Sequence, residues 1–126
     1  MDVTPLIKSG TQIIQSYTGG VFKVSSLTYD HPVYVTPEDT CAWEVADVTT
    51  VADLTIQNFD MIVADSVDVV LLGAGVEMAF LPKTLKIQLK EAGLSVDIMD
   101  TGAACRTYNV LMAEGRRVAC LLLPYN

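Results

Sequence analysis

The chain has 126 residues, of which 51 % are hydrophobic, and its formal net charge is −7. This length suffices for one domain with a buried core and is too short for two. The acidic balance argues against a nucleic-acid-binding protein, since such proteins need a basic face against the phosphates. We therefore expect a single domain over residues 1–126, with residues 1–11 as a loosely ordered N-terminal segment.

The chain lacks the features of a secreted or membrane-spanning protein. Residues 1–5 carry neither the basic start of a signal peptide nor the arginines of an organelle presequence. The most apolar run, residues 67–81, is too short for a transmembrane segment. The cysteines are odd in number and form no Cys-x-x-Cys pair, which favours a reducing compartment. We expect a cytoplasmic protein.

The first half of the chain predicts short antiparallel strands. Residues 21–24 alternate apolar with polar, and the pattern returns at 27–29, 33–35 and 41–45 between turn signals such as Ser25-Ser26 and His31-Pro32. A short helix is expected from Val51, capped by Thr49 or Thr50, with Leu54 and Phe59 pointing inward. Residues 61–63 are interpreted as a further short extended piece.

The second half predicts strand, helix, strand, helix and strand. The nearly continuous apolar runs at residues 67–72 and 118–123 are typical of strands buried on both faces. A helix is expected from Pro82 to Ala92 with Gly93 as its stop, a strand at 94–98, and a helix at 103–114 closed by Gly115. Two consecutive right-handed βαβ crossovers follow. The predicted fold is a three-layer α/β domain with a mixed central sheet and additional N-terminal antiparallel strands.

Two loops at the carboxyl ends of parallel strands form the candidate ligand site, because ligands of open α/β sheets gather there. The residues that we expect to bind a small anion lie in residues 73–77 and 100–106, namely Gly73, Gly75, Asp100, Thr101, Gly102, Cys105 and Arg106. Glycines let a ligand approach the backbone, and free amides at a helix start favour an anion. The alternative interpretation is that both loops are only tight turns and a helix cap.

Cys105 falls in the first turn of the last helix, beside Arg106. A helix N-terminus and a cation both stabilise a thiolate, so a lowered pKa and a reactive cysteine are one possibility. A small packed residue is the other, since no base accompanies the thiol. Cys41 and Cys120 lie in predicted strands and are expected in the core.

The sequence shows no metal-binding or catalytic constellation. The single histidine, His31, has no ligand partner at suitable spacing and is interpreted as a turn residue. We therefore assign no catalytic residue, metal or cofactor. Lys83, Lys86 and Lys90 share one helix face, which is a possible docking surface for a partner protein or simply a solvated face.

Two segments carry a resemblance to a known family: Leu71-Leu72-Gly73-Ala74-Gly75 before a proline-started helix, and the run from Thr101 to Val118. The chain resembles, from about Gln12 to Pro124, a domain-of-unknown-function family of small α/β proteins. Its eukaryotic relatives include a mitochondrial assembly factor for respiratory complex I and an adipogenesis-associated protein. The resemblance implies a three-layer fold and supplies no catalytic residue. Because the chain lacks the presequence expected of the mitochondrial member, the resemblance favours a bacterial cytoplasmic protein.

Two functional hypotheses follow. The first is a non-enzymatic interaction or assembly protein that docks on a partner, which by resemblance would be a respiratory-chain subunit. The second is a binder of a small anionic ligand, or an enzyme, that uses the two loops at the strand ends. A thiol-based redox sensor at Cys105 is a third and weaker interpretation.

Overall fold

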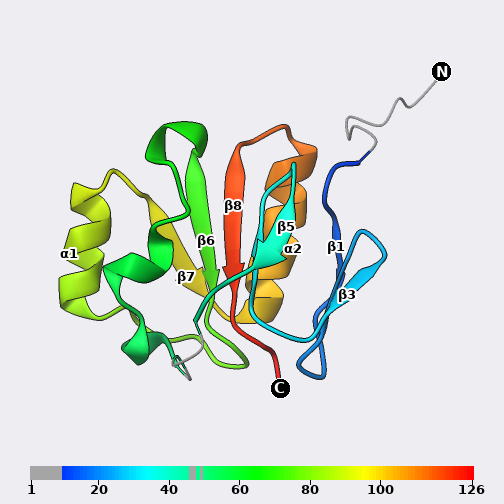
Figure 1. Cartoon of the computed structure of the whole chain (residues 1–126), viewed down its shortest axis with the longest axis horizontal. Coiled ribbons are helices and arrows are strands. Elements are labelled where there is room, and N and C mark those ends of the chain that lie inside the picture. Colours follow the sequence, from blue (N-terminus) through cyan, green and yellow to red (C-terminus); the bar gives the residue numbers. More distant parts are fainter. Residues whose placement is uncertain (1–9, 46–47, 49) are drawn as a thin grey trace.

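The computed structural model describes residues 10–45, 48 and 50–126. These residues form two sheets, one of three strands and one of five (Figure 1). The expected N-terminal segment lies largely outside the described residues. Within them, the backbone is tied down from Gln12, whose N–H donates to the carbonyl of Pro37 at 3.0 Å.

The centre of the larger sheet is the parallel unit expected from the second half of the chain. Its elements, in chain order, are β6 (Val69–Gly73), α1 (Lys83–Glu91), β7 (Val96–Met99), α2 (Thr101–Ala113) and β8 (Val118–Leu122). β6 lies between β7 and β8 and is parallel to both. The two βαβ crossovers are confirmed.

The antiparallel strands of the first half divide between the two sheets. β4 (Val33–Val35) pairs antiparallel with β8, and β5 (Thr40–Ala42) pairs with β4, so the order across the larger sheet is β5-β4-β8-β6-β7. β1 (Ile14–Ser16), β2 (Phe22–Val24) and β3 (Leu27–Tyr29) form the separate antiparallel sheet. Ser25 and Ser26 turn the β2–β3 hairpin with positive φ angles of 46° and 73°, which agrees with the bend predicted there.

The larger sheet separates two hydrophobic cores, and β6 faces both. Val70 and Leu72 pack with Leu85 and Leu89 of α1 on one side. Leu71 points the other way, into the core under α2 and the three-stranded sheet. All three β6 side chains are at most 1 % exposed, and each fully buried aliphatic side chain stabilises the fold by about 1.5–3 kcal/mol. The three-layer α/β fold with a mixed central sheet is confirmed (Figure 1).

The segment between β5 and β6 differs in part from expectation. Three 3-10 helices replace the single short helix: η1 (Val51–Asp53), η2 (Ile56–Phe59) and η3 (Ala64–Ser66). Thr50 is the N-cap of η1, and Leu54 and Phe59 are buried as predicted; Thr49 lies outside the described residues. Residues 61–63 form no strand; they connect η2, which ends at Phe59, to η3, which begins at Ala64.

The helix α1 begins one residue later than predicted. Pro82 has φ −53° and ψ 138°, so it is the N-cap, and the helix begins at Lys83. Its extended ψ angle keeps Pro82 outside the helix, although its ring-fixed φ is compatible with one. Gly93 ends the helix as expected, with a φ angle of +78° that a side chain would strain.

Candidate functional site

The two predicted loops meet at one edge of the sheet, as parallel topology requires. β6 ends at Gly73 and β7 at Met99, and Ala74 N–H donates to the Met99 carbonyl at 2.8 Å. The end of β8 joins them, since Leu123 N–H donates to the Gly73 carbonyl at 3.0 Å. The loops are therefore neighbours, and direct backbone hydrogen bonds tie them together.

Thr101 fills the space between the three strand ends. Its hydroxyl accepts from Gly75 N–H at 2.9 Å and donates to the Leu123 carbonyl at 2.7 Å. Its own N–H donates to the Gly75 carbonyl at 2.8 Å. The side chain is fully buried, so the predicted ligand-facing hydroxyl points into the protein.

Close packing at Gly73 and the backbone conformation at Gly75 explain why both residues are glycine. A Cβ on Gly73 would lie 2.9 Å from Thr101 Oγ1 and 2.9 Å from Leu122 Cδ2, closer than side-chain atoms approach. Gly75 has a φ angle of +100°, a conformation that other residues rarely adopt. Both glycines thus fit the alternative interpretation of tight turns, and neither requires a ligand.

The start of α2 is occupied by a carboxylate of the chain itself. Asp100 is the N-cap, and its Oδ1 accepts from Ala103 N–H at 2.9 Å. A helix N-terminus attracts negative charge, and the Asp100 carboxylate already supplies it. Thr101 follows the cap as the first residue of the helix.

Tyr17 lies over the start of α2 and was not predicted to belong to this site. Its hydroxyl accepts from Arg106 Nη1 at 2.9 Å, and a Cβ on Gly102 would lie 2.9 Å from the same oxygen. Tyr125 packs edge-on against Tyr17, with ring centroids 5.3 Å apart. Tyr17 and Arg106 are 89 positions apart, and no local pattern connects them.

Cys105 is buried, with 2 % of its surface exposed. Burial raises the pKa of its thiol to about 12, which outweighs the opposite effect of Arg106. The structure therefore fits the packed-residue interpretation of Cys105 and not the alternative of a lowered pKa. Cys120 lies in the same core, as predicted. Cys41 was expected in the core as well, but it is exposed on the edge strand β5.

The ionisable residues elsewhere form no metal-binding group within the part of the chain that the structure describes. His31 lies in the turn between β3 and β4, with Nδ1 2.9 Å from the Pro32 carbonyl oxygen. Over residues 10–45, 48 and 50–126, no cluster of three or more His, Cys, Asp or Glu side chains has metal-binding geometry. Arg117 forms an exposed ion pair with Asp68 at 2.8 Å.

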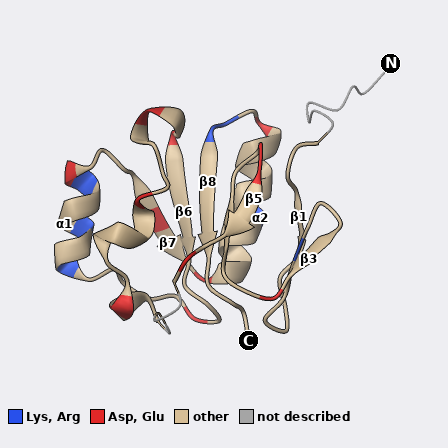
Figure 2. Ribbon diagram, viewed as in Figure 1, with Lys and Arg blue, Asp and Glu red and all other residues tan. Residues whose placement is uncertain are grey.

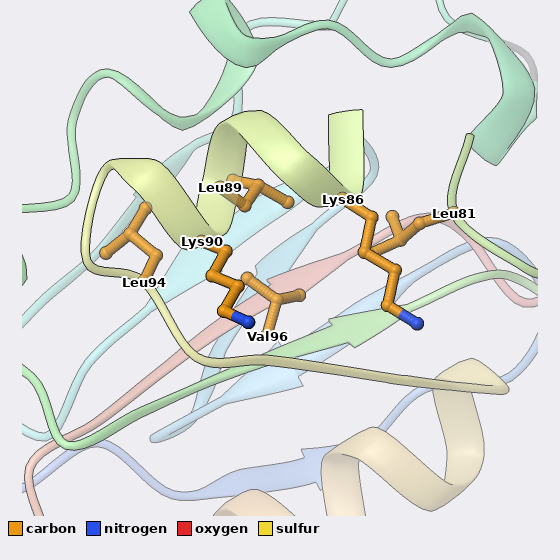
Figure 3. A pocket seen from close by; sticks show the side chains of 6 residues that line it. All are labelled: Leu81, Lys86, Leu89, Lys90, Leu94 and Val96. Carbon is orange, nitrogen blue, oxygen red and sulfur yellow. The ribbon is translucent and has the colours of Figure 1, made fainter. Parts of the chain in front are cut away.

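The predicted docking lysines lie on α1, at the opposite side of the sheet from the three-stranded layer (Figures 1 and 2). Lys86 and Lys90 extend over an open groove of about 170 Å³ between α1 and β7 (Figure 3). The groove is lined by Leu81, Lys86, Leu89, Lys90, Leu94 and Val96. Lys83 belongs to the same helix but not to this lining.

Exposed apolar side chains accompany these lysines. Phe80, in the loop just before α1, is 83 % exposed, and Ile87 on α1 is 51 % exposed. We call Phe80, Lys83, Lys86, Ile87 and Lys90 the α1 surface. Contiguous apolar patches rimmed by polar or charged residues are typical of protein-binding surfaces.

The fold and this site define a small α/β protein with a mixed apolar and basic surface on α1. The sequence profile of the family described as "Protein of unknown function (DUF498/DUF598)" matches residues 14–123. The chain therefore belongs to this family, which confirms the resemblance noted from the sequence.

Solved structures show the same fold. A Bartonella henselae protein described as an outer membrane protein is 34 % identical, with a TM-score of 0.80 over 93 % of this chain and 98 % of its own. A Bordetella pertussis protein described as a Mth938-like domain is 28 % identical, with a TM-score of 0.77 over 98 % of this chain and 92 % of its own. In the described residues, no helix has the length and apolar character that crossing a membrane requires.

One group of relatives carries a functional name. A zebrafish (Danio rerio) protein named NADH dehydrogenase [ubiquinone] 1 alpha subcomplex assembly factor 3 is 28 % identical over 118 residues. The match covers 92 % of this chain and 66 % of the zebrafish protein. The relative is thus longer than the shared domain, and its name describes the whole of that protein.

Proposed function

We propose that this protein acts by binding another protein, as an interaction or assembly protein and not as an enzyme, and that the α1 surface makes the contact. The observation that carries the proposal is the pairing of exposed Phe80 and Ile87 with three lysines on one helix of a chain whose net charge is −7. Burying the apolar side chains would stabilise a complex, and the lysines would select an acidic partner.

The relatives support the same role. The name of the zebrafish protein refers to assembly of NADH dehydrogenase, and the matched region includes most of this chain. We therefore propose a respiratory-chain subunit with an acidic surface as the class of partner to test first. The small-anion site at the strand ends stays a prediction, which the buried Thr101 hydroxyl and the Asp100 cap do not favour.

The experiment is an affinity capture with purified NADH dehydrogenase subunits, read by quantitative mass spectrometry. The test variant is K83E/K86E, and the matched control is K23E/R116E, which makes the same change in net charge at exposed positions away from α1. We expect wild type and the control to retain the same subunit and K83E/K86E to lose it. Equal capture by all three would contradict the α1 surface, and no capture by any would contradict this class of partner.

A further inference from the structure

β7 is the last strand of the larger sheet, and one of its edges is open among the residues that the structure describes. On its paired edge, Val70 N–H donates to the Ser95 carbonyl at 2.9 Å, and Ala74 N–H donates to the Met99 carbonyl at 2.8 Å. Backbone groups of alternate residues in a strand face opposite edges. The N–H and C=O groups of Val96 and Ile98 therefore face the open edge.

This edge is shaped to accept another strand. β7 pairs with β6 in regular register from Val96 to Met99, without a bulge or a proline that would block addition. The groove of about 170 Å³ runs beside it, with Val96 and Leu94 from the strand side and Leu81 from the α1 side. An extended segment along β7 would place alternate side chains in this apolar groove.

Lys86 and Lys90 determine the charge of the segment that fits. Both side chains extend from α1 toward the β7 side of the groove (Figure 3). They would meet acidic side chains of an added strand. They also disfavour a second copy of this chain, because pairing two β7 edges would bring the lysines of both copies to one seam.

The opposite edge of the sheet, at β5, carries negative charge. β5 has only three residues, and Asp39 and Glu44 flank it with exposed carboxylates. β7 also carries an exposed carboxylate, Asp97, but side chains alternate along a strand, so Asp97 lies on the sheet face opposite Val96 and the groove. An acidic strand would be repelled at β5, whereas its groove-facing carboxylates would be attracted at β7 by Lys86 and Lys90. The groove face of β7 is thus distinguished from β5 by charge.

We propose that the open edge of β7 is a strand-addition site for an extended acidic segment of a partner protein. The segment would hydrogen-bond to the backbone of Val96 and Ile98, insert an apolar side chain between Leu81 and Val96, and pair its carboxylates with Lys86 and Lys90. Main-chain hydrogen bonds supply affinity and alternate side chains supply specificity in this mode of recognition. The inference rests on the proposed protein-binding function and names the mode of that contact.

The test begins with phage-displayed random dodecapeptides selected on the full-length protein and counter-selected on K86E/K90E. We expect the enriched peptides to alternate apolar with acidic residues. A synthetic peptide of the consensus sequence should then slow amide hydrogen exchange at Val96 and Ile98 by roughly tenfold or more. The amide of Asp97, which faces β6 inside the sheet, is the internal control.

N-methylation of the peptide separates strand pairing from simple charge attraction. Methyl groups on the backbone amides of one peptide edge should abolish binding, whereas methyl groups on the other edge should leave it intact, with side chains and charge unchanged. The variant K23E/R116E should bind the peptide as wild type does, and K86E/K90E should not.

Three results would overturn the inference: a selection without acidic binders, equal tolerance of both methylated peptides, or binding without added protection at Val96 and Ile98. If one of these results is obtained while K83E/K86E still loses the captured subunit, the proposed function stands and only the strand-addition mode is contradicted. Loss of both the capture and the edge protection would contradict both proposals.

Discussion

Thr101 and Gly75 are joined by two hydrogen bonds in opposite directions: Gly75 N–H donates to Thr101 Oγ1 at 2.9 Å, and Thr101 N–H donates to the Gly75 carbonyl at 2.8 Å. The Thr101 hydroxyl then donates to Leu123 at 2.7 Å. One buried side chain thereby connects the ends of all three parallel strands. The sequence suggested Thr101 as a ligand-binding residue, and in the structure its side chain holds the strand ends together.

Thr101→Val should destabilise the protein by about 1–3 kcal/mol, because it preserves shape and leaves the Gly75 N–H without its buried partner. Urea unfolding followed by circular dichroism measures the change. Thr107→Val, at a partly exposed position of the same helix, is the control and should shift stability by less than about 0.5 kcal/mol. Equal stabilities for the two variants would contradict the role of Thr101.

Gly73→Ala should destabilise the protein by about 1–3 kcal/mol through overpacking. The added Cβ would lie 2.9 Å from Leu122 Cδ2 and 3.0 Å from Thr101 Cα, and the latter is backbone that cannot move aside easily. The same urea titration measures it. A urea unfolding midpoint for Gly73→Ala equal to that of wild type would contradict the predicted overpacking and show that the strand ends are less tightly packed.

The three thiols should differ in reactivity. Cys41 is exposed, whereas Cys105 and Cys120 are buried. Alkylation of the native protein near neutral pH should therefore modify Cys41 alone, and more slowly than a free cysteine peptide, because partial burial and Asp39 raise its pKa. Peptide mapping by mass spectrometry locates the adducts. Fast modification of Cys105 would revive the redox interpretation.

Alkaline pH should destabilise the fold through Cys105. Its thiol ionises near 9.0 when unfolded and at about 12 when folded, so the folded state binds more protons in between and its stability falls as pH rises. Cys105→Ala should flatten this slope between these two pH values. Unfolding midpoints measured across the range check it, and an unchanged slope in the variant would contradict the assignment.

The Asp68–Arg117 pair should contribute less to the stability of the fold at acidic pH. Hydrogen bonds from Arg117 lower the pKa of the Asp68 carboxyl, so the pair stabilises the fold above the unfolded pKa and loses this effect as pH falls through the folded one. Arg117→Ala should raise the Asp68 pKa toward its ordinary value. Carboxyl carbon NMR titration detects the change, and the same titration midpoint in both proteins would refute it.

Elements that depend on local pattern were predictable from the sequence. The apolar runs of β6 and β8 signalled strands buried on both faces, and Gly93 and Gly115 marked helix ends. The parallel arrangement followed from chain order, and it correctly placed both loops at one edge of the sheet.

The details of the candidate site depended on contacts that sequence spacing does not encode. Tyr17 reaches Arg106 across 89 positions, and the inward direction of Thr101 is set by the end of β8. Cys41 was assigned to the core because it lies in a predicted strand, but β5 is an edge strand that leaves the thiol exposed. Burial raises the pKa of Cys105 by more than Arg106 lowers it, a balance that depends on how the side chain packs.

The central claim is that the α1 surface binds another protein, and the affinity of the captured subunit for charge variants tests it most directly. Isothermal titration should give a dissociation constant at least about tenfold weaker for K83E/K86E than for wild type, a difference of about 1.4 kcal/mol. K23E/R116E, with the same net charge, should bind as wild type does. Equal weakening by both variants, or no weakening by either, would contradict the claim.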